Sequence, residues 1–589
     1  MTRGEPLYFG PESRPLFGWL HRAPAPARLG LVICNPFGYE AVCTHRILRH
    51  FAQAAAASGV PALRFEYDGT GNSAGDDRDP ERLPAWVASV GHAVDALRAH
   101  AAVERVVLLG VRLGALIAAL AAGKREDVDG LVAIAPVVAG KAHVRELRAL
   151  QMSTAPLPRP PGVLDEEGVQ PALGFPLLAA TKADLSAVDL ARLERAPAPA
   201  VLLLERDDLP ADDAWPRHLA ALGVAVDRRR LPGYVEMMLG AEAGKVPAEM
   251  VGATTEWLGA RAALLAAEPP RPPCPGPAPI TRSRARLGEI VETPELVDEA
   301  GRLFGVLSTP AAPPAARRGL LLLNAGAVHH IGPNRLYVTL ARRWAALGHA
   351  VLRLDVAGIG DSLPAPGRPE NLVYTDEASE DIRQALAFLR RQPGVTEVHA
   401  LGLCSGGYNA FKAAVAGVPL DGVLLINPLT FSYQADRPLS EAEDKTISEA
   451  SRYLRRLRDP EAWKKLLRGG LDLGLAARTM RRFVVDRLRG RTQELARRAG
   501  LEVGHDLARE LTSLADKRVR LGFVFSAGDP GIGLLRTHGG PVVEKLRRDG
   551  QLSIEIIEGP DHTFTPLWSH PVLTSTLAAH FDHLPRSRG

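Results

Sequence analysis

Short apolar runs alternate with longer amphipathic segments along most of the chain. Uninterrupted apolar runs of about four to eight residues are typical of buried strands. Such runs occur at 29–34, 62–65, 106–109, 131–134, 320–323, 398–401, 519–525 and 552–557. Helical spacing of the apolar residues predicts helices between them, over 44–58, 86–100 and 408–416. Strands that alternate with helices predict an α/β fold class, a mostly parallel sheet with helices on both faces.

The order of motifs in the first half of the chain returns in the second half. Arg64–Ser73 lines up with Arg353–Ser362 without a gap, and both segments carry a G-x-G turn before the final serine. The apolar run that begins at Leu29 likewise matches the run that begins at Leu320. A chain of this length also exceeds the size of one hydrophobic core. The sequence therefore predicts a tandem duplication, two α/β domains of the same fold.

A proline-rich stretch, Pro269–Pro279, separates the two halves. So many prolines exclude a helix or the centre of a sheet, because the ring fixes the backbone and removes the amide proton. They predict a stiff, extended linker. We expect a first domain over 1–266, a linker over 267–280 and a second domain over 281–589. An insertion in the second domain, about 430–515, has helical runs and predicts a lid over the site.

The composition is that of an ordinary globular protein, with 46% hydrophobic and 23% charged residues. The formal net charge of +4 demands neither nucleic acid nor a membrane surface as a partner. Four cysteines in 589 residues form no disulfide framework, which favours a reducing compartment. The N-terminus lacks the apolar core of a signal peptide, and no apolar stretch of about 18 residues exists. We therefore expect a cytoplasmic protein without a membrane span.

One short segment, Gly402-Leu403-Cys404-Ser405-Gly406, lies between a predicted strand and a predicted helix. A strand, a sharp turn and a helix, with small residues two places before and after the centre, form the nucleophile elbow, G-x-Nu-x-G. The glycine frame puts Cys404 at the nucleophile position. If Ser405 were the nucleophile, Leu403 would occupy a position that needs a small residue. A buried, unreactive Cys404 is the alternative, because free cysteines are among the most buried residues.

The acid and the base of such a site follow at fixed places in the fold. The acid comes after a late strand and the histidine after the last strand. Asp529 follows the predicted late strand, and His562 follows the predicted last strand. We therefore predict a Cys404–His562–Asp529 triad. Asp561 is a second candidate for the acid, although a residue next to the histidine usually points away from its ring.

The oxyanion that forms when a carbonyl is attacked needs preorganised N–H donors. The Ser405 amide supplies one donor by the geometry of the elbow, and Ala325 or Gly326, after an early strand, supplies the other. His329 and His330 lie just past this loop and are candidates for substrate contacts or for the loop surface. The predicted chemistry needs neither a metal nor another cofactor.

The corresponding positions of the first half lack two members of the triad. Arg112 occupies the nucleophile position, and arginine is charged at working pH and cannot attack a carbonyl. Asp208 stands at the acid position and Glu236 at the histidine position. We predict a non-catalytic copy in which Arg112 forms a salt bridge with Asp208 or Glu236. An anion site for a carboxylate or a phosphate is the alternative.

Both halves resemble α/β hydrolases of the serine-aminopeptidase-like group. The second half is also similar to hydrolases found with exosortase systems, which carry a comparable N-A-G…G-P-N-R loop, here Asn324–Arg335, and a G-I-G-D-S turn, here Gly358–Ser362. Cysteine elbows of this fold resemble two kinds of enzyme: dienelactone hydrolases, which open activated esters, and aminoacyl-shuttling enzymes of nonribosomal peptide pathways. The resemblance implies the fold and leaves the substrate open, because one fold hosts many chemistries.

The predicted function is cysteine-dependent acyl transfer, by a hydrolase or an acyltransferase, through an acyl-cysteine intermediate. Exchange of one thioester for another is nearly isoenergetic, which favours a small acyl ester or thioester as the substrate. Arginine and lysine outnumber acidic residues between Arg452 and Arg498. This excess predicts a docking face for an acyl carrier protein or coenzyme A, or a solvated helical face. The alternatives are a serine-type esterase that uses Ser405 and a non-catalytic binding scaffold.

Overall fold

The computed structural model describes residues 4–153, 159–164, 166–269, 283–312, 317–433 and 506–582. Most of the predicted lid lies outside the described residues, between 434 and 505, and so does its basic segment. Most of the predicted linker, with Cys274, also lies outside them, between 270 and 282. We call residues 4–269 the N-terminal half and residues 283–582 the C-terminal half, each within its described ranges.

The N-terminal half is built on an eight-stranded sheet in the order β1-β2-β4-β3-β5-β6-β9-β10. Strands β1 and β2 pair antiparallel with each other, β2 pairs antiparallel with β4, and the other neighbours are parallel. The strands are β1 Glu5–Phe9, β2 Leu16–His21, β3 Leu29–Cys34, β4 Ala62–Phe65, β5 Arg105–Val111, β6 Val128–Ile134, β9 Ala200–Arg206 and β10 Ala225–Leu231. A separate hairpin joins β7 Val169–Ala172 to β8 Phe175–Leu178.

The C-terminal half is built on a nine-stranded sheet in the order β11-β12-β13-β15-β14-β16-β17-β18-β19. The order from β12 to β19 repeats that of the first sheet, and the edge up to the β13–β15 pair is again antiparallel. The strands are β11 Ala285–Leu287, β12 Ile290–Leu296, β13 Phe304–Pro310, β14 Arg317–Leu323, β15 Ala350–Asp355, β16 Val395–Leu403, β17 Gly422–Ile426, β18 Arg520–Ser526 and β19 Leu552–Ile557. The α/β prediction is confirmed, and the antiparallel edges were not predicted.

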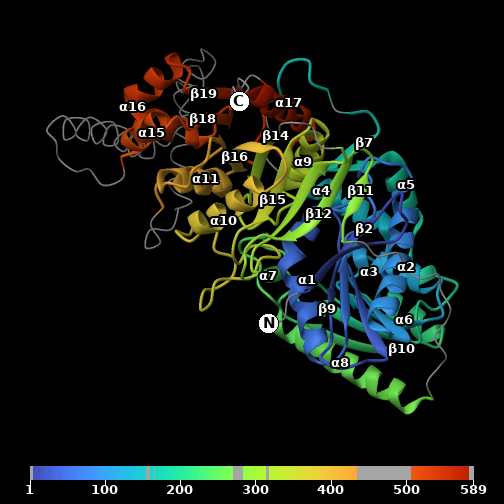
Figure 1. Cartoon of the computed structure of the whole chain (residues 1–589). Coiled ribbons are helices and arrows are strands. Elements are labelled where there is room, and N and C mark those ends of the chain that lie inside the picture. Colours follow the sequence, from blue (N-terminus) through green and yellow to red (C-terminus); the bar gives the residue numbers. More distant parts are fainter. Residues whose placement is uncertain are drawn as a thin grey trace, which may run out of the picture.

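Helices cover both faces of each sheet (Figure 1). In the N-terminal half they are α1 Tyr39–Ala57, α2 Arg82–Ala101, α3 Leu113–Ala122, α4 Gly140–Ser153, α5 Ala179–Ala187, α6 Ala214–Ala221, α7 Tyr234–Met237 and α8 Ala248–Ala267, with the 3-10 turn η1 Leu190–Arg192. In the C-terminal half they are η2 Pro333–Arg335, α9 Leu336–Ala346, α10 Ala378–Arg390, α11 Ser405–Val415, α15 Leu507–Asp516, α16 Pro530–Arg548 and α17 Ser569–Asp582. Of the helices in the described part of the chain, none is both long and apolar enough to cross a membrane.

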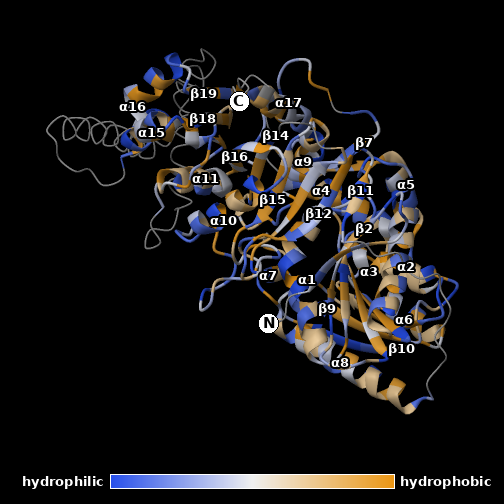
Figure 2. Ribbon diagram, in the orientation of Figure 1, coloured by the Kyte–Doolittle hydropathy of each residue, from blue (hydrophilic) through white to orange (hydrophobic). Residues whose placement is uncertain are grey.

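Side chains of the central strands alternate between two hydrophobic cores, because successive residues of a strand point to opposite faces. In β14, Leu321 and Leu323 pack with residues of α10 and α11, whereas Leu320 and Leu322 pack with residues of α9 and α17. The N-terminal sheet shows the same alternation, with α2 and α3 on one face and α1 and α8 on the other. Figure 2 shows the strands largely in the hydrophobic colours, as burial on both faces requires.

The two segments that align without a gap also form the same hydrogen bonds. Ser73 Oγ accepts the Phe17 amide at 2.9 Å, and Ser362 Oγ accepts the Phe304 amide at 2.8 Å. The acid at the third position of each segment, Glu66 or Asp355, accepts the amide of the residue six positions later, Asn72 or Asp361, at 2.5 and 3.0 Å. The aligned polar residues therefore form equivalent local hydrogen bonds in both halves.

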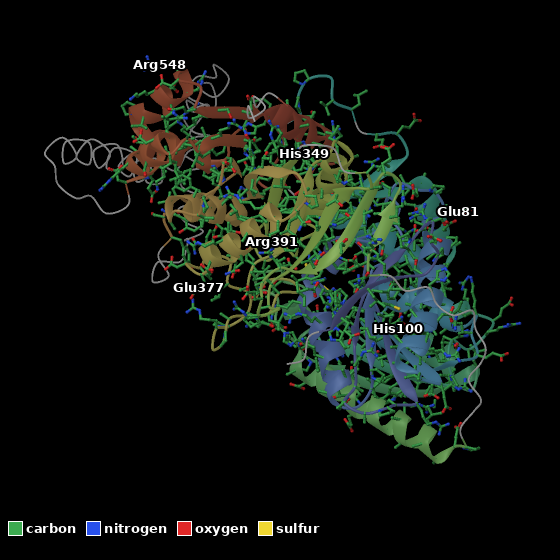
Figure 3. The ribbon with its side chains drawn as sticks, in the orientation of Figure 1. Glu81, His100, His349, Glu377, Arg391 and Arg548 are labelled. Carbon is green, nitrogen blue, oxygen red and sulfur yellow. The ribbon has the colours of Figure 1, made fainter. Side chains whose placement is uncertain are left out.

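The two halves contact each other through reciprocal pairs. Arg64 donates to Asp361 at 2.8 Å, and Arg353, the residue aligned with Arg64, donates at 2.7 Å to Asn72, the residue aligned with Asp361. Phe304 packs against Trp19 with ring centroids 4.6 Å apart. In Figure 3 the labelled Arg548 lies at the far upper edge of the C-terminal half, and the labelled His100 lies within the N-terminal half. The contact has the self-complementary character of a two-fold interface.

Candidate active site

Cys404 occupies a strained turn between β16 and α11. Its backbone has φ 57° and ψ −119°, in the left-handed half of the map that a residue with a side chain rarely enters. Gly402 and Gly406 permit the turn: a Cβ on Gly406 would lie 2.5 Å from Leu323 O, and a Cβ on Gly402 would collide with Gly406 itself. Arg112 in the N-terminal half has nearly the same dihedral angles, φ 53° and ψ −119°. Both elbows therefore have the geometry that exposes a side chain above the sheet.

Ser405 points into the protein, where its hydroxyl holds the loop after β14. The Gly326 amide donates to Ser405 Oγ at 2.9 Å, and the hydroxyl lies 3.4 Å from Asn324 O. The side chain is buried, whereas Cys404 is partly accessible. This contact corrects the sequence-based choice of oxyanion donors, because the Gly326 amide is already engaged. It also gives the Ser405 hydroxyl a structural part.

The remaining donors are the amides of Ser405 and Ala325. Ser405 is the first residue of α11, and the first amides of a helix have no partner within it. The Ala325 amide has no hydrogen-bond partner among the residues that the structure describes. An anion at the N-terminus of α11 is also favoured by the helix dipole. These two amides are therefore the candidate oxyanion donors beside Cys404.

His562 and Asp529 meet at the carboxyl ends of β18 and β19. His562 Nδ1 lies 2.7 Å from Asp529 Oδ2. The other carboxylate oxygen of Asp529 caps α16 by accepting the Gly531 amide at 2.9 Å, so the acid is fixed in position. Asp561 instead accepts the Thr565 amide at 2.7 Å and holds its own turn.

The free side of the His562 ring faces Cys404. His562 Nε2 is buried and has no hydrogen-bond partner among the described residues. Burial lowers the pKa of His562, but Asp529 and the Cys404 sulfur outweigh it and raise the pKa to about 10. A histidine held between a carboxylate and a thiol is suited to form a thiolate–imidazolium pair.

The raised pKa of His562 makes a prediction about stability. A histidine whose folded pKa exceeds its unfolded value contributes stability that is complete below the unfolded value of 6.5 and disappears as the pH rises to about 10. The free energy of unfolding should therefore fall between pH 6.5 and 10 more steeply in the wild type than in Asp529→Asn, which lacks the charged partner. Urea unfolding at a series of pH values measures this difference, and parallel curves would contradict it.

Asn427 joins the histidine and acid loops and was missed in the sequence. Its Nδ2 donates to the His562 carbonyl at 2.6 Å, and its Oδ1 accepts the Ser526 amide at 2.8 Å. Its backbone is strained, with φ 44°. The sequence could have indicated Asn427 by its position directly after the buried strand β17, because functional groups lie at the carboxyl ends of parallel strands.

Tyrosines that the sequence analysis did not single out surround the sulfur. Tyr374 Oη lies 4.0 Å from Cys404 Sγ. The Tyr374 ring stacks on Tyr433 at 4.7 Å and meets the edge of Tyr408 at 5.2 Å. These rings form an aromatic wall beside the nucleophile position. No periodicity links residues so far apart in sequence, and only the fold brings them together.

His329 and His330 do not have the exposed position expected of substrate contacts. Both are buried where the halves meet: His329 stacks on His45 of the N-terminal half at 3.6 Å, and His330 hydrogen-bonds Asn72 at 2.9 Å. His330 also bonds Asp355 at 2.8 Å. Their ring contacts join the two halves. This structural role accounts for both histidines, so no contact with a substrate is needed to explain them.

His330, Asp355 and Asp361 lie close enough to suggest a metal site, with ligand atoms within 4.8 Å of one another. Each ligand group already has a protein partner, however. Asp361 accepts from Arg64, Asp355 accepts from Asn324 at 2.8 Å, and both ring nitrogens of His330 are engaged. The cluster is therefore satisfied as a polar contact between the halves.

Arg112 pairs with residues other than those predicted. Its guanidinium donates to Glu40 at 3.0 Å and to Glu146 at 2.5 Å. Asp208 pairs instead with Arg206 at 2.6 Å, and Glu236 is exposed on α7. Arg112 does form salt bridges, but with partners other than the predicted Asp208 and Glu236. Because two carboxylates neutralise the guanidinium, no free positive charge remains there to bind an anion, which argues against the alternative of an anion site.

Comparisons with known proteins found one family model and several similar solved structures. Residues 21–161 match the family model described as serine aminopeptidase, S33. Similar solved structures include a putative hydrolase from Agrobacterium vitis S4 (18% identity, 44% of this chain and 98% of that one, TM-score 0.31) and the ferulic-acid complex of Est1E from Butyrivibrio proteoclasticus (15%, 44% and 99%, 0.33). Proline iminopeptidase from Mycobacterium smegmatis is another (15%, 45% and 100%, 0.32). A search of curated proteins gave no match.

The chain has the α/β-hydrolase fold, with mostly parallel sheets flanked by helices. This fold supports hydrolytic or acyl-transfer chemistry in general, and the particular reaction depends on the residues at the site. The matched family segment lies in the N-terminal half, which carries Arg112 at its elbow, whereas the grouped thiol, imidazole and carboxylate belong to the C-terminal half.

Proposed function

We propose that the C-terminal half is a cysteine-dependent acyl-transfer enzyme that acts on an ester or thioester through an acyl-Cys404 intermediate. The observation that carries the proposal is the position of His562, between the Asp529 carboxylate at 2.7 Å and the sulfur at the elbow. The N-terminal half is proposed to be a second, non-catalytic copy of the fold, because Arg112 replaces the nucleophile.

The proposed reaction has two balanced steps. His562 Nε2 takes the thiol proton, and Cys404 Sγ attacks the carbonyl carbon of the substrate. The oxyanion is bound by the Ser405 and Ala325 amides, and its collapse expels an alcohol or thiol that recovers the proton from His562. In the second step His562 deprotonates water or an acceptor thiol, which attacks the thioester carbonyl. The bond between the acyl carbon and Cys404 Sγ breaks, the acid or the new thioester leaves, and His562 returns the proton to the Cys404 thiolate. Asp529 keeps the imidazole in the required tautomer throughout.

The buried Ser405 hydroxyl favours cysteine over serine as the nucleophile. An oxygen that accepts the Gly326 amide at 2.9 Å inside the protein is not directed toward a substrate, whereas Cys404 stands at the strained position of the elbow. A thiolate is also a good nucleophile toward esters and thioesters and leaves readily when the acceptor is a thiol. These properties support thioester or activated ester substrates over amides.

Mass spectrometry of the intact protein tests the proposal. After exposure to p-nitrophenyl acetate, the wild type should gain one acetyl group on Cys404 with a burst of p-nitrophenol, and Ser405→Ala should keep the burst. Cys404→Ala should show no burst. A burst that survives in Cys404→Ala and disappears in Ser405→Ala would support a serine esterase instead. No acylation in any of the three proteins would support the binding-scaffold alternative.

The acceptor is tested on the acyl-enzyme itself. The acetyl-Cys404 protein, freed of reagent, is divided between buffer and buffer with a carrier-like thiol such as N-acetylcysteamine. Loss of the acetyl mass at the same rate in both samples indicates a hydrolase. A faster loss with the thiol, and recovery of the new thioester, indicates an acyltransferase.

A further inference from the structure

A loop of the N-terminal half reaches into the C-terminal half beside the candidate site. The loop follows α7, the position at which a catalytic copy would carry its histidine. Asn371 of the C-terminal half donates to the carbonyls of Ala241 at 2.9 Å and Glu242 at 2.7 Å. Ala241 also packs against the hydrophobic core of the C-terminal half. On its other side, the Gly244 carbonyl accepts from Arg46 on α1. The loop is therefore fixed to both halves.

The Glu242 carboxylate lies over the turn that carries the oxyanion donor. Gly326 has a positive φ of 56°, and Glu242 Oε1 occupies the space that a Cβ on Gly326 would need. The Ala327 amide also faces this carboxylate and opposes the rise of its pKa. Ser405 Oγ accepts the Gly326 amide and the Glu242 carboxylate packs against Gly326, whereas the preceding amide, Ala325, has no partner among the described residues.

The charge of Glu242 also acts on His562. Glu242 is exposed on the loop, but partial enclosure of its carboxyl raises its pKa, and the positive charge of His562 opposes that rise, so the two side chains attract each other. Tyr39 on α1 is the other titratable group that faces Glu242. No arginine or lysine in the described ranges forms an ion pair with Glu242. Its charge is therefore available to favour a protonated imidazole.

We propose that Glu242 is a positioning residue of the Cys404 site, supplied by the non-catalytic half. It holds the turn from Ala325 to Ala327 so that the Ala325 amide stays directed at the oxyanion, and its charge favours the imidazolium form of His562. The first of these effects rests on the proposed acyl-transfer function, and the second does not. The N-terminal half is thus a required part of the site.

Two substitutions separate the contact with the turn from the charge. Glu242→Gln keeps a side-chain oxygen to pack against Gly326 beside the Ala327 amide but removes the charge, whereas Glu242→Ala removes both. Glu249→Gln, an exposed acid on α8 of the same half, is the matched control. Thermal unfolding of all four proteins is measured alongside.

The electrostatic contact is read from the pH dependence of Cys404 alkylation by iodoacetamide, followed on the Cys404 peptide by mass spectrometry. Loss of a negative charge favours the thiolate and disfavours the imidazolium, so the profile should move to lower pH by about half a unit in both Glu242 variants. Glu249→Gln should not move it. A profile that also stays unchanged in Glu242→Gln would overturn the electrostatic part of the proposal.

The positional contact is read from the acylation rate with p-nitrophenyl acetate. Glu242→Ala should slow kcat about tenfold with little change in KM. A displaced donor weakens binding of the transition state much more than binding of the ground state. Glu242→Gln should remain within about threefold of the wild type, since its amide oxygen restores the contact. Equal losses in both variants with equal falls in the unfolding temperature would identify a merely structural residue and overturn the proposal.

Failure of the proposed function is distinguishable from failure of this inference. A wild-type protein that is never acylated refutes acyl transfer and the oxyanion role with it. The alkylation profile still decides the contact between Glu242 and His562, because iodoacetamide requires only a reactive thiol.

Discussion

His562→Ala is expected to slow acylation of Cys404 by about a thousandfold at pH 7, which is the usual size of a general-base effect in such a site. The reason is that a free thiol with a pKa near 8.5 is only a few per cent ionised at about pH 7. In the proposed mechanism the imidazole, with its pKa raised to about 10 by Asp529 and the sulfur, accepts the thiol proton.

The loss should shrink as the pH rises. Above about pH 9 the thiol ionises without help, so the ratio of wild-type to His562→Ala rates should fall toward about ten. Asp529→Asn should show a large loss as well, because the 2.7 Å contact that orients the ring is changed. Asp561→Asn is the control, since that carboxylate only holds its own turn. Stopped-flow p-nitrophenol release measures all four proteins, and equal effects of the two asparagine variants would contradict the assignment of the acid.

The sequence was sufficient to predict the elbow because its physical requirements are local. A turn with φ near 57° needs glycines at fixed distances, and the frame Gly402–Gly406 has no other equally good explanation. The strands that lead to Asp529 and His562 were also readable, because strands buried on both faces are continuously apolar. The loops after such strands meet at one edge of the sheet, so their order placed both residues.

The contacts that the sequence did not yield are all non-local. Arg112 bonds Glu40 and Glu146, which come from α1 and α4 and have no positional relation to a triad. The antiparallel edge strands were missed because strands such as β1 are short and only partly apolar. The burial of His329 depends on the other half, whose His45 stacks on its ring. Local pattern carries no information about which surfaces of two domains meet.

The interface gives the half without a triad a structural role. Arg64 and Arg353 are buried charges that reach across to aligned partners, and removal of one partner of a buried pair leaves an uncompensated charge. The same contact fixes the orientation of the two halves, which in turn sets where the loop with Glu242 lies. The half that carries Arg112 at its elbow therefore has a structural role at this interface.

Gly406→Ala is expected to cost stability and activity together. A Cβ at this position would lie 2.5 Å from Leu323 O and 2.7 Å from Asn324 O, both of them backbone atoms at the end of β14 that cannot turn aside. Relief of this overlap requires α11 or β14 to shift, at a cost of about 1–3 kcal/mol in the free energy of unfolding. Because Cys404 and the Ala325 amide are carried by these two elements, the nucleophile and the oxyanion donor should separate. A misplacement of about 1 Å commonly costs about a hundredfold in rate.

The control for this substitution is Gly259→Ala on the exposed face of α8, where an added Cβ meets no atom within 4 Å. Alanine favours a helix over glycine by about 1 kcal/mol, so Gly259→Ala should stabilise the protein slightly and leave acylation unchanged. Urea unfolding and the acylation rate of both variants provide the comparison. If Gly406→Ala unfolded at the wild-type urea concentration and kept its rate, the close packing of the elbow against β14 would not be what holds Cys404 in its strained conformation.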